Sequence, residues 1–328
     1  SLSPFFKYTC TKEWKGYRRQ ADAVWHIFDS TSQKYRNWAK AEVRSITDTF
    51  RTIFYPFSGP DFLYVNMFYP NAEKIYMFGL EDVGSVPDAK KILPDSLPKM
   101  LLSYKIAISD VINISFFRTV DMKNELASSS IDGTTPIIML FLARSGKTVT
   151  GVTMMTLDTA GRLVPIPQGA DKSKFENRGV EICYQNPGEN KTRRICYLTN
   201  NVADPALKKN KAYKKFFLSV EKHCGGYVKS ATYLMHKTYF STIRNVLLKK
   251  ADFILQDDSG IAYKYFDKEK WAIQLYGSYT KPIPLFEEFF EQDLFDAYQN
   301  GNVKKLNFRI GYHPKSNLLV AKRISSVY

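Results

Sequence analysis

Two stretches of this chain, Ile53–Gly84 and Ala231–Gly260, show the same order of features. Each reads as a short apolar strand, a polar turn, an amphipathic helix and a second apolar strand, followed by two acidic residues and a nearby glycine. Alternation of strands and helices is typical of α/β proteins, which place ligand-contacting groups at the ends of their strands. The pattern therefore predicts an α/β fold and indicates where a site would lie.

The segments that follow the two units are also alike. Each unit is followed by an expected helix and then by an expected strand hairpin. The helices are predicted at Leu97–Phe117 and near Pro284–Tyr298, and the hairpins pair Ile137–Ala143 with Val149–Leu157 and Leu306–Tyr312 with Asn317–Lys322. Because the halves share negligible sequence identity, ordinary α/β alternation is the alternative to an internal duplication.

A chain of 328 residues with 44% hydrophobic residues is long enough for two domains. We expect two similar, three-layer-like α/β halves, with their boundary in the polar segment that begins at Gly169. The first half, residues 1–168, starts with a helical segment, Glu13–Thr52, interrupted near Asp29–Ser32. The second half covers residues 169–328.

The formal net charge of +15 is concentrated in Pro205–Lys250, where 11 lysines and arginines face the single acid Glu221. Apolar residues recur there at helical spacing, so a solvated surface helix is the simplest interpretation. A basic face that attracts an anionic surface is the alternative. Lysine without interleaved arginine and aromatic residues argues against a nucleic-acid partner. No apolar run approaches the roughly 20 residues of a membrane helix, and no signal peptide is visible.

Four cysteines fit either a reducing or an oxidising compartment. Cys183 and Cys196 flank a predicted hairpin, and in one register they face each other and can form a disulfide. Two reduced strand cysteines are the alternative. No Cys and His cluster has the spacing of a zinc site, so the sequence predicts no metal and no bound cofactor.

The turn Phe57–Asp61 joins the first predicted strand to its helix. Ser58 suits a helix N-cap and Pro60 the first helical position, which explains both residues by structure alone. A helix N-terminus also offers amide donors to a ligand. Because Asp61 repels anions, we expect a hydroxylated or cationic ligand group here rather than a phosphate. Ser58 and Asp61 are therefore candidate ligand-binding residues.

Glu81 lies at the end of the next predicted strand, about 20 residues beyond this turn. That spacing is similar to Rossmann units and methyltransferases, whose acidic residue binds a ribose hydroxyl. Only Gly59 is present where such units carry two or three glycines. A nucleotide-dependent or methyl-donor-dependent transferase is therefore one alternative function.

The acidic residues of the two units also suggest a hydrolase. Glycosidases need two carboxylates about 5 to 9.5 Å apart, which Glu81 or Asp82 and Asp257 or Asp258 can supply if the halves face each other. Turn capping is the commoner explanation of Asp257 and Asp258. We retain Glu81 and Asp257 as catalytic candidates, and Asp82 and Asp258 as ligand-binding candidates.

Two further residues complete the candidate site. His236 follows the predicted strand Ala231–Met235 at the position equivalent to Ser58, and it is a candidate general base. Tyr279 is a candidate aromatic wall of the ligand site. The segment His223–Gly226 is interpreted as a turn that ends a helix.

Three stretches, FYPFSGPDFLYVNMFYPNAEKIYMFGLE, LYGSYTKPIPLF and LNFRIGYHPKSNLLVAKR, resemble segments of an uncharacterised family of bacterial proteins that are exported or lipid-anchored. The matching segments lie between about Phe54 and Arg323. The resemblance implies an extracytoplasmic location, periplasmic or at the cell surface, with a cytoplasmic one as the alternative. It implies no activity and no catalytic residue.

The leading hypothesis is an exported bacterial binding or accessory protein. Its small-molecule or glycan ligand would lie at the carboxyl ends of strands between the two halves. The alternatives are a hydrolase of glycans or esters that uses a carboxylate pair, and the nucleotide-dependent or methyl-donor-dependent transferase.

Overall fold

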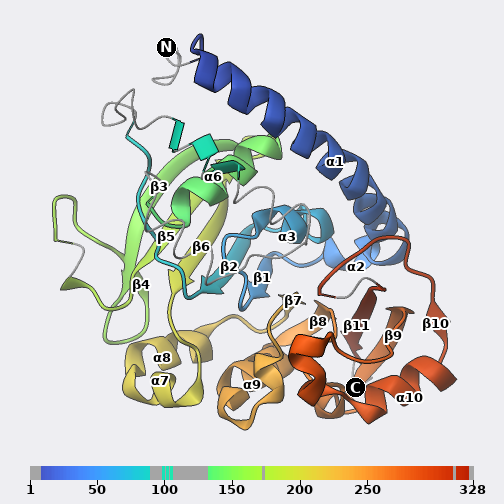
Figure 1. The fold of residues 1–328 in the computed structure, drawn as a ribbon. Helices are drawn as coiled ribbons and strands as arrows, with labels where there is room; N and C mark the ends of the chain where they lie inside the picture. Colours follow the sequence, from blue (N-terminus) through green and yellow to red (C-terminus); the bar gives the residue numbers. More distant parts are fainter. Residues whose placement is uncertain are drawn as a thin grey trace.

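The computed structural model describes residues 9–88, 98–99, 101–102, 104–105, 132–171, 174–312 and 315–324, and these residues form one continuous mixed sheet with helices on both faces (Figure 1). The strands are β1 Thr52–Tyr55, β2 Lys74–Gly79, β3 Thr148–Leu157, β4 Leu163–Pro165, β5 Gly179–Gln185, β6 Arg193–Thr199, β7 Cys224–Val228, β8 Ala251–Gln256, β9 Trp271–Gly277, β10 Val303–Lys304 and β11 Asn317–Arg323. The α-helices are α1 Lys12–Glu42, α2 Arg44–Thr47, α3 Phe62–Phe68, α6 Thr135–Arg144, α7 Asp204–Lys209, α8 Lys211–Ser219, α9 Ser241–Lys250 and α10 Gln292–Asn300. Short 3-10 helices are η4 Leu234–His236, η5 Thr238–Phe240, η6 Tyr263–Tyr265 and η7 Pro284–Phe289. This architecture confirms the predicted α/β class.

The strands lie in the order β10-β9-β11-β8-β7-β1-β2-β6-β5-β3-β4. Five central neighbours, β8, β7, β1, β2 and β6, are parallel. The strands β1, β2, β6, β7, β8, β9 and β11 can be numbered 1 to 7 in chain order. Across the sheet, from β6 to β9, they then lie in the order 3-2-1-4-5-7-6. This is a doubly wound order in which the antiparallel β11 is inserted between the fifth and sixth strands. The crossover from β1 leads to β2 on one side, whereas the crossover from β7 leads to β8 on the other. The winding therefore reverses between β1 and β7.

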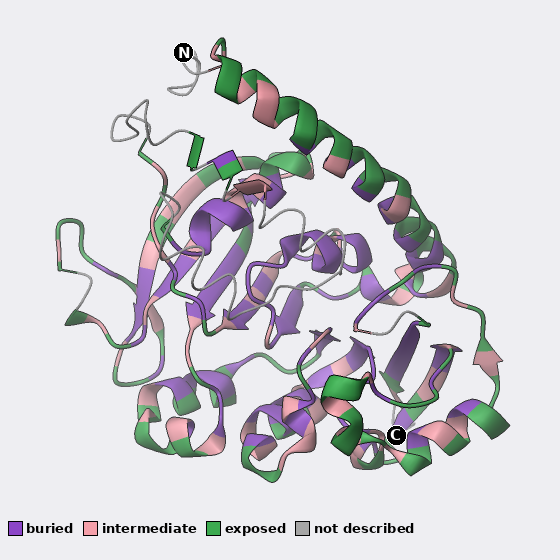
Figure 2. Ribbon diagram, viewed as in Figure 1, coloured by how far each residue is buried: buried purple, intermediate pink, exposed green. Residues whose placement is uncertain are grey.

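Two hydrophobic cores lie on opposite faces of the sheet. Along β1, Ile53 and Tyr55 belong to the core under α1, α3 and α6, whereas Phe54 belongs to the core over α7, α8 and α9. This alternation is the period of two expected of a strand that is covered on both faces. Figure 2 shows the buried strands between helices whose outer faces are exposed. Right-handed crossovers that run in opposite directions place α3 and α9 on opposite faces, so the sheet is the middle of three layers.

Both strand–helix–strand units are present, but the second unit begins with a different strand from the one that the sequence predicts. It is β7, Cys224–Val228, and the predicted strand Ala231–Met235 is instead a turn that leads into η4. The two adjacent glycines of β7 are a pattern typical of a turn, yet here they lie in a strand whose neighbours leave no space for larger side chains. An added Cβ at Gly225 would lie 2.8 Å from Ile53 Cδ1, and one at Gly226 would lie 3.0 Å from Leu247 Cδ2.

Neither predicted hairpin forms as expected. The apolar run Ile137–Ala143 lies in helix α6, and Pro136 in its first turn favours the start of that helix. The prediction of a strand fails here because a run of apolar residues is compatible with a buried helix as well as with a buried strand. Leu306–Tyr312 is not a strand, and β11 pairs with β8 and β9 instead. The predicted helix Leu97–Phe117 lies largely outside the described residues.

The sheet crosses the predicted boundary between residues 1–168 and 169–328. Strand β3, before the boundary, pairs with β5, after it, and β2 pairs with β6. The two units share one sheet and wind in opposite directions. An internal duplication is therefore not confirmed by the fold.

Helix α1 is continuous, so the expected interruption near Asp29–Ser32 is wrong. Ser32 is buried, and its Oγ donates to the Asp29 carbonyl at 3.0 Å within the helix. Thr11 caps the start by accepting from the Trp14 N–H at 3.2 Å. In the described ranges, no helix combines the length and the apolar character needed to cross a bilayer.

The predicted hairpin around the cysteines is β5 and β6, and its register excludes a disulfide. Glu181 lies opposite Cys196, and Cys183 lies opposite Arg194, so the two cysteines are two positions out of register. Both thiols are free. The alternative of two reduced strand cysteines is the one that the structure shows.

Candidate functional site

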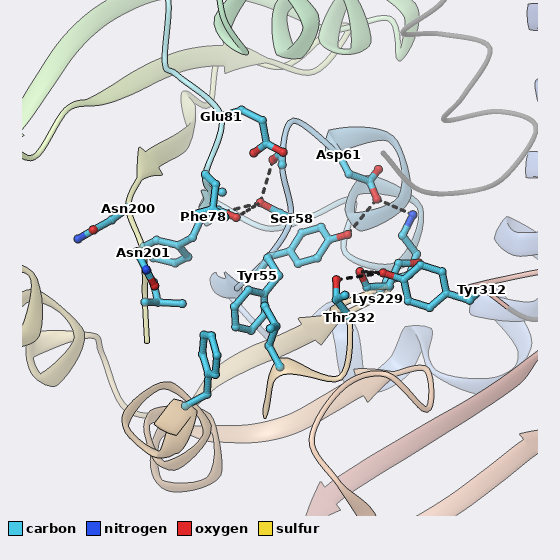
Figure 3. Close-up of a pocket in the computed structure, with 18 residues that line it drawn as sticks. Tyr55, Ser58, Asp61, Phe78, Glu81, Asn200, Asn201, Lys229, Thr232 and Tyr312 are labelled. Atoms are coloured by element: carbon cyan, nitrogen blue, oxygen red, sulfur yellow. Dashed lines mark hydrogen bonds and ion pairs between the residues drawn. The ribbon is translucent and has the colours of Figure 1, made fainter. Parts of the chain in front are cut away.

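A cavity of about 330 Å³ lies at the carboxyl ends of β1, β2, β6 and β7, where the winding reverses (Figure 3). In doubly wound sheets, ligands bind at this position. We call it the switch-point cavity. Its lining residues are Tyr55, Phe57, Ser58, Gly59, Asp61, Phe78, Gly79, Leu80, Glu81, Asn200, Asn201, Val202, Lys229, Ser230, Thr232, Leu234, Phe240 and Tyr312.

The backbone of the two loops that form this cavity is strained. Among the described residues other than glycine, five have positive φ, and four of them follow β1 or β7. These four are Phe57 (φ 58°), Ser230 (φ 51°), Thr232 (φ 55°) and Tyr233 (φ 53°). Each left-handed residue costs on the order of 1 kcal/mol, and such residues cluster at ligand sites. The strain thus coincides with the position that the topology favours for a ligand.

A buried ion pair joins the two loops. Lys229 Nζ lies 2.7 Å from Asp61 Oδ2, and the two side chains are only 2% and 3% exposed. The Tyr55 hydroxyl donates to the same Asp61 oxygen at 2.9 Å, as Figure 3 shows. Lys229 also lies over the Tyr64 ring, 3.6 Å from its centroid. Burial lowers the pKa of Lys229, and the charge of Asp61 opposes that shift.

Asp61, not Ser58, caps helix α3. Its Oδ1 accepts from the Tyr64 N–H at 3.2 Å. The Ser58 Oγ instead accepts from the Phe78 N–H at 3.0 Å and donates to the Gly59 carbonyl at 2.9 Å. These bonds hold the loop after β1 against the end of β2. Both residues line the cavity, as the sequence predicts for ligand-contacting groups.

Glu81 lies two residues beyond the end of β2 and is 3% exposed. The Tyr197 hydroxyl lies 3.2 Å from Glu81 Oε2 and 3.0 Å from the Glu81 carbonyl oxygen, so it orients the carboxylate. Gly79 permits this approach, because an added Cβ there would lie 2.3 Å from Oε2. The same Cβ would lie 3.3 Å from Gly59 Cα, so two glycines face each other at the ends of β1 and β2.

Asp82 points away from the switch-point cavity. Its side chain is 68% exposed and pairs with Arg178 at 2.9 Å. Its carbonyl accepts from the Thr134 N–H at 2.9 Å. Adjacent residues of an extended segment face opposite sides, which explains why Glu81 lines the cavity and Asp82 does not.

Asp257 and Asp258 do not line the switch-point cavity either. Asp257 accepts from the Ser230 N–H at 2.8 Å and from the Ser259 N–H at 3.0 Å, and it thereby holds the strained loop after β7. Burial, and then the charge of Asp258, raise the pKa of Asp257. Asp258 accepts from the Tyr233 hydroxyl. Glu81 therefore has no carboxylate partner from the second unit in its cavity.

His236 belongs to a second buried cluster, together with Glu291. His236 Nε2 lies 3.7 Å from Glu291 Oε1, and it has no hydrogen-bond partner among the described residues. Burial lowers the pKa of His236 to about 4 and raises the pKa of Glu291 to about 8. In the described ranges, no group of three or more His, Cys, Asp and Glu residues has a metal-binding arrangement.

Tyr279 packs in the same region rather than in the switch-point cavity. Its ring lies nearly parallel to that of Phe290, at 6.3 Å between centroids, and its hydroxyl accepts from the Glu291 N–H at 3.1 Å. It is 2% exposed. Tyr279 therefore forms part of the core over α10 and is not a wall of the cavity.

The structure thus brings together Ser58, Asp61 and Glu81, and it places the other five predicted site residues elsewhere. Lys229 and Tyr312 were missed. Lys229 directly follows an apolar strand, so a correct placement of β7 would have identified it. Tyr312, whose hydroxyl donates to the Ser230 carbonyl at 2.7 Å, arrives from a distant segment that gives no local signal.

The lysine-rich segment forms α7 and α8. Tyr213, Phe216 and Phe217 are buried, which confirms the predicted apolar stripe, and the lysines of the two helices are exposed. The attraction of an anionic surface by this face stays a prediction.

Comparisons with protein-family models, with curated proteins and with solved structures each gave no match.

Proposed function

We propose that the protein binds a nucleoside, or a small molecule that carries one, in the switch-point cavity. The observation that carries this proposal is the place of Glu81. Its carboxylate follows the strand next to β1, in a cavity at the point where a doubly wound sheet reverses. Nucleotide-binding proteins of this fold class use an acidic residue at that position to bind ribose hydroxyls.

The walls of the cavity suit a planar base. Phe57, Phe78, Leu80 and Phe240 provide aromatic and aliphatic surface, while Asn201 adds an amide. A mostly apolar pocket with a few convergent polar groups is the usual form of a small-molecule site. Stacking of a base on such surface is worth about 1–3 kcal/mol.

The charges of the lining argue against a phosphate tail. Its charged residues are Asp61, Glu81 and Lys229, and Lys229 is already paired with Asp61. Glycines are also few: Gly59 and Gly79 face each other, whereas dinucleotide sites carry three within one loop. These features favour a nucleoside over a dinucleotide.

This geometry favours a transferase or a binding protein over a hydrolase. The carboxylate pair that a glycosidase would need is divided, because Glu81 lines the cavity while Asp257 and Asp258 lie outside it. A nucleoside-bearing ligand is compatible with a methyl-donor-dependent transferase. It is equally compatible with a protein that only binds its ligand.

Replacement of Glu81 by glutamine tests the proposal. Calorimetric titration of the wild-type protein with adenosine is expected to show saturable one-to-one binding. Glu81→Gln should weaken it about tenfold or more, because hydrogen bonds to a carboxylate are worth about 1.5–3 kcal/mol. Asp82→Asn is the matched control and should leave the affinity within about twofold, since Asp82 is exposed and paired with Arg178. Equal affinities of wild-type and Glu81→Gln protein would refute the role of Glu81.

A further inference from the structure

The switch-point cavity has two different polar ends. The Glu81 carboxylate lies at the carboxyl end of β2, whereas the Lys229–Asp61 pair joins the loops after β1 and β7. Figure 3 shows the two sets apart from each other, with Ser58 and Tyr55 between them. Both sets line the same cavity. A ligand that reaches both therefore needs a hydroxylated part and a second polar part of different chemistry.

The second end presents one positive and one negative group side by side. Lys229 Nζ and Asp61 Oδ2 are 2.7 Å apart, and both side chains are almost entirely withdrawn from water. Buried ion pairs are weak evidence for stability, because the cost of desolvation offsets most of their attraction. A pair that faces a ligand cavity can in addition recognise charge. A single anion, such as a phosphate, would be attracted by Lys229 but repelled by Asp61.

We infer that the ligand carries an amino-acid tail on its nucleoside, and that Lys229 and Asp61 bind the carboxylate and the ammonium group of that tail. This inference rests on the proposed function. A zwitterion placed along the pair meets each charge with its opposite, so the four charges alternate. The tail then extends from the nucleoside at Glu81 to the loops after β1 and β7.

An unsatisfied hydroxyl at this end supports the assignment. Ser230 follows Lys229, lines the cavity and adopts a left-handed backbone with φ 51°. Its Oγ is buried and has no hydrogen-bond partner in the part of the chain that the structure describes. Buried hydroxyls are nearly always bonded, so this one is available to a ligand or water oxygen that accepts a hydrogen bond. The carboxylate of the tail would accept from this hydroxyl.

Three probes that share one nucleoside test the inference. The wild-type protein is titrated with adenosine, with adenosine 5′-monophosphate, and with S-adenosylhomocysteine, which carries an α-amino acid on the same 5′ carbon. S-adenosylhomocysteine is expected to bind at least about tenfold more tightly than adenosine. The monophosphate should bind no more tightly than adenosine. These comparisons need no variant.

Two variants then locate the tail. The double variant Lys229→Met/Asp61→Asn removes both charges together, and it should bring the affinity for S-adenosylhomocysteine to within about twofold of that for adenosine. Ser230→Ala keeps the ion pair and should lower the affinity for S-adenosylhomocysteine, relative to that for adenosine, by about threefold or more. The ratio of the two affinities is the readout in both variants, and their folding is checked by thermal unfolding.

The outcomes separate the inference from the function on which it rests. If adenosine binds and S-adenosylhomocysteine binds no more tightly, the amino-acid tail is refuted and the nucleoside site stands. Tighter binding of the monophosphate than of S-adenosylhomocysteine would also overturn the tail. If neither adenosine nor S-adenosylhomocysteine binds, the proposed function itself fails.

Discussion

Replacement of Lys229 alone by methionine is expected to lower the free energy of unfolding by about 3–5 kcal/mol. Asp61 would then be a buried carboxylate without its counter-charge, with the Tyr55 hydroxyl and the Tyr64 N–H as its neighbours. The loss of stability comes from the buried Asp61 carboxylate that is left without a counter-charge, and not from the removal of a strong attraction. Urea denaturation at constant pH measures it as a lower midpoint with an unchanged slope.

Two controls test this explanation. The double variant Lys229→Met/Asp61→Asn should recover most of the stability, because neither charge then stays buried. Lys191→Met breaks the ion pair with Glu73, whose Nζ–Oε1 distance is 2.6 Å, but Lys191 is 48% exposed. That change should cost about 1 kcal/mol or less. A loss for Lys229→Met no larger than that for Lys191→Met would contradict a buried, charged pair.

Stability is expected to fall by about 2 kcal/mol as the pH rises from about 6.5 to about 8.5. Burial raises the pKa of Glu291 to about 8, from 4.5 in the unfolded chain. The folded protein therefore keeps a proton that the unfolded chain has lost, and stability falls as the pH rises from about 4.5 through about 8. The raised pKa of Asp257 acts in the same direction.

His236 opposes this trend only at lower pH. Its pKa is lowered by burial from 6.5 to about 4, so its contribution rises with pH between these values and is constant above them. The fall in stability is therefore clearest above about pH 6.5. Thermal unfolding at a series of pH values measures it.

Glu291→Gln should flatten the pH dependence above about pH 6.5. Its side-chain oxygen can still accept from the Tyr263 N–H, which lies 2.7 Å from Glu291 Oε2. The variant should therefore be more stable than the wild-type protein at about pH 8.5. Glu288→Gln, at an exposed position of the same segment, is the control and should leave the slope unchanged. An unchanged slope in Glu291→Gln would show that Glu291 is ionised in the folded protein near neutral pH.

Local signals were sufficient to predict the first unit of the fold but not the second. The unit β1-α3-β2 has an apolar strand, a turn with Gly59 and Pro60, and a second apolar strand. In the second unit, the adjacent glycines of β7 are a pattern typical of a turn. Their actual role is to leave space for the side chains of Ile53 and Leu247, which pack against the strand. Tertiary contacts of this kind override local propensity.

Only the part of the candidate site that lies on the first unit could be predicted from the sequence. Ser58, Asp61 and Glu81 lie on one local unit, so the sequence places them together. Lys229 reaches Asp61 only because β1 pairs with β7, which sets Ile53 beside Gly225. The sequence pattern predicts a ligand-facing acid at Asp257, but its carboxylate accepts hydrogen bonds from the Ser230 and Ser259 N–H groups. The extracytoplasmic location implied by the bacterial resemblance stays a prediction.

Hydrogen exchange measured with and without saturating adenosine tests most directly whether the switch-point cavity binds a nucleoside. We predict slower exchange at the end of the cavity that holds the nucleoside, namely residues 57–59 of the loop after β1 and residues 79–81 after β2. Glu81→Gln should abolish this protection at the same adenosine concentration. Protection confined to other segments, such as residues 284–290, or no protection at all, would contradict the account.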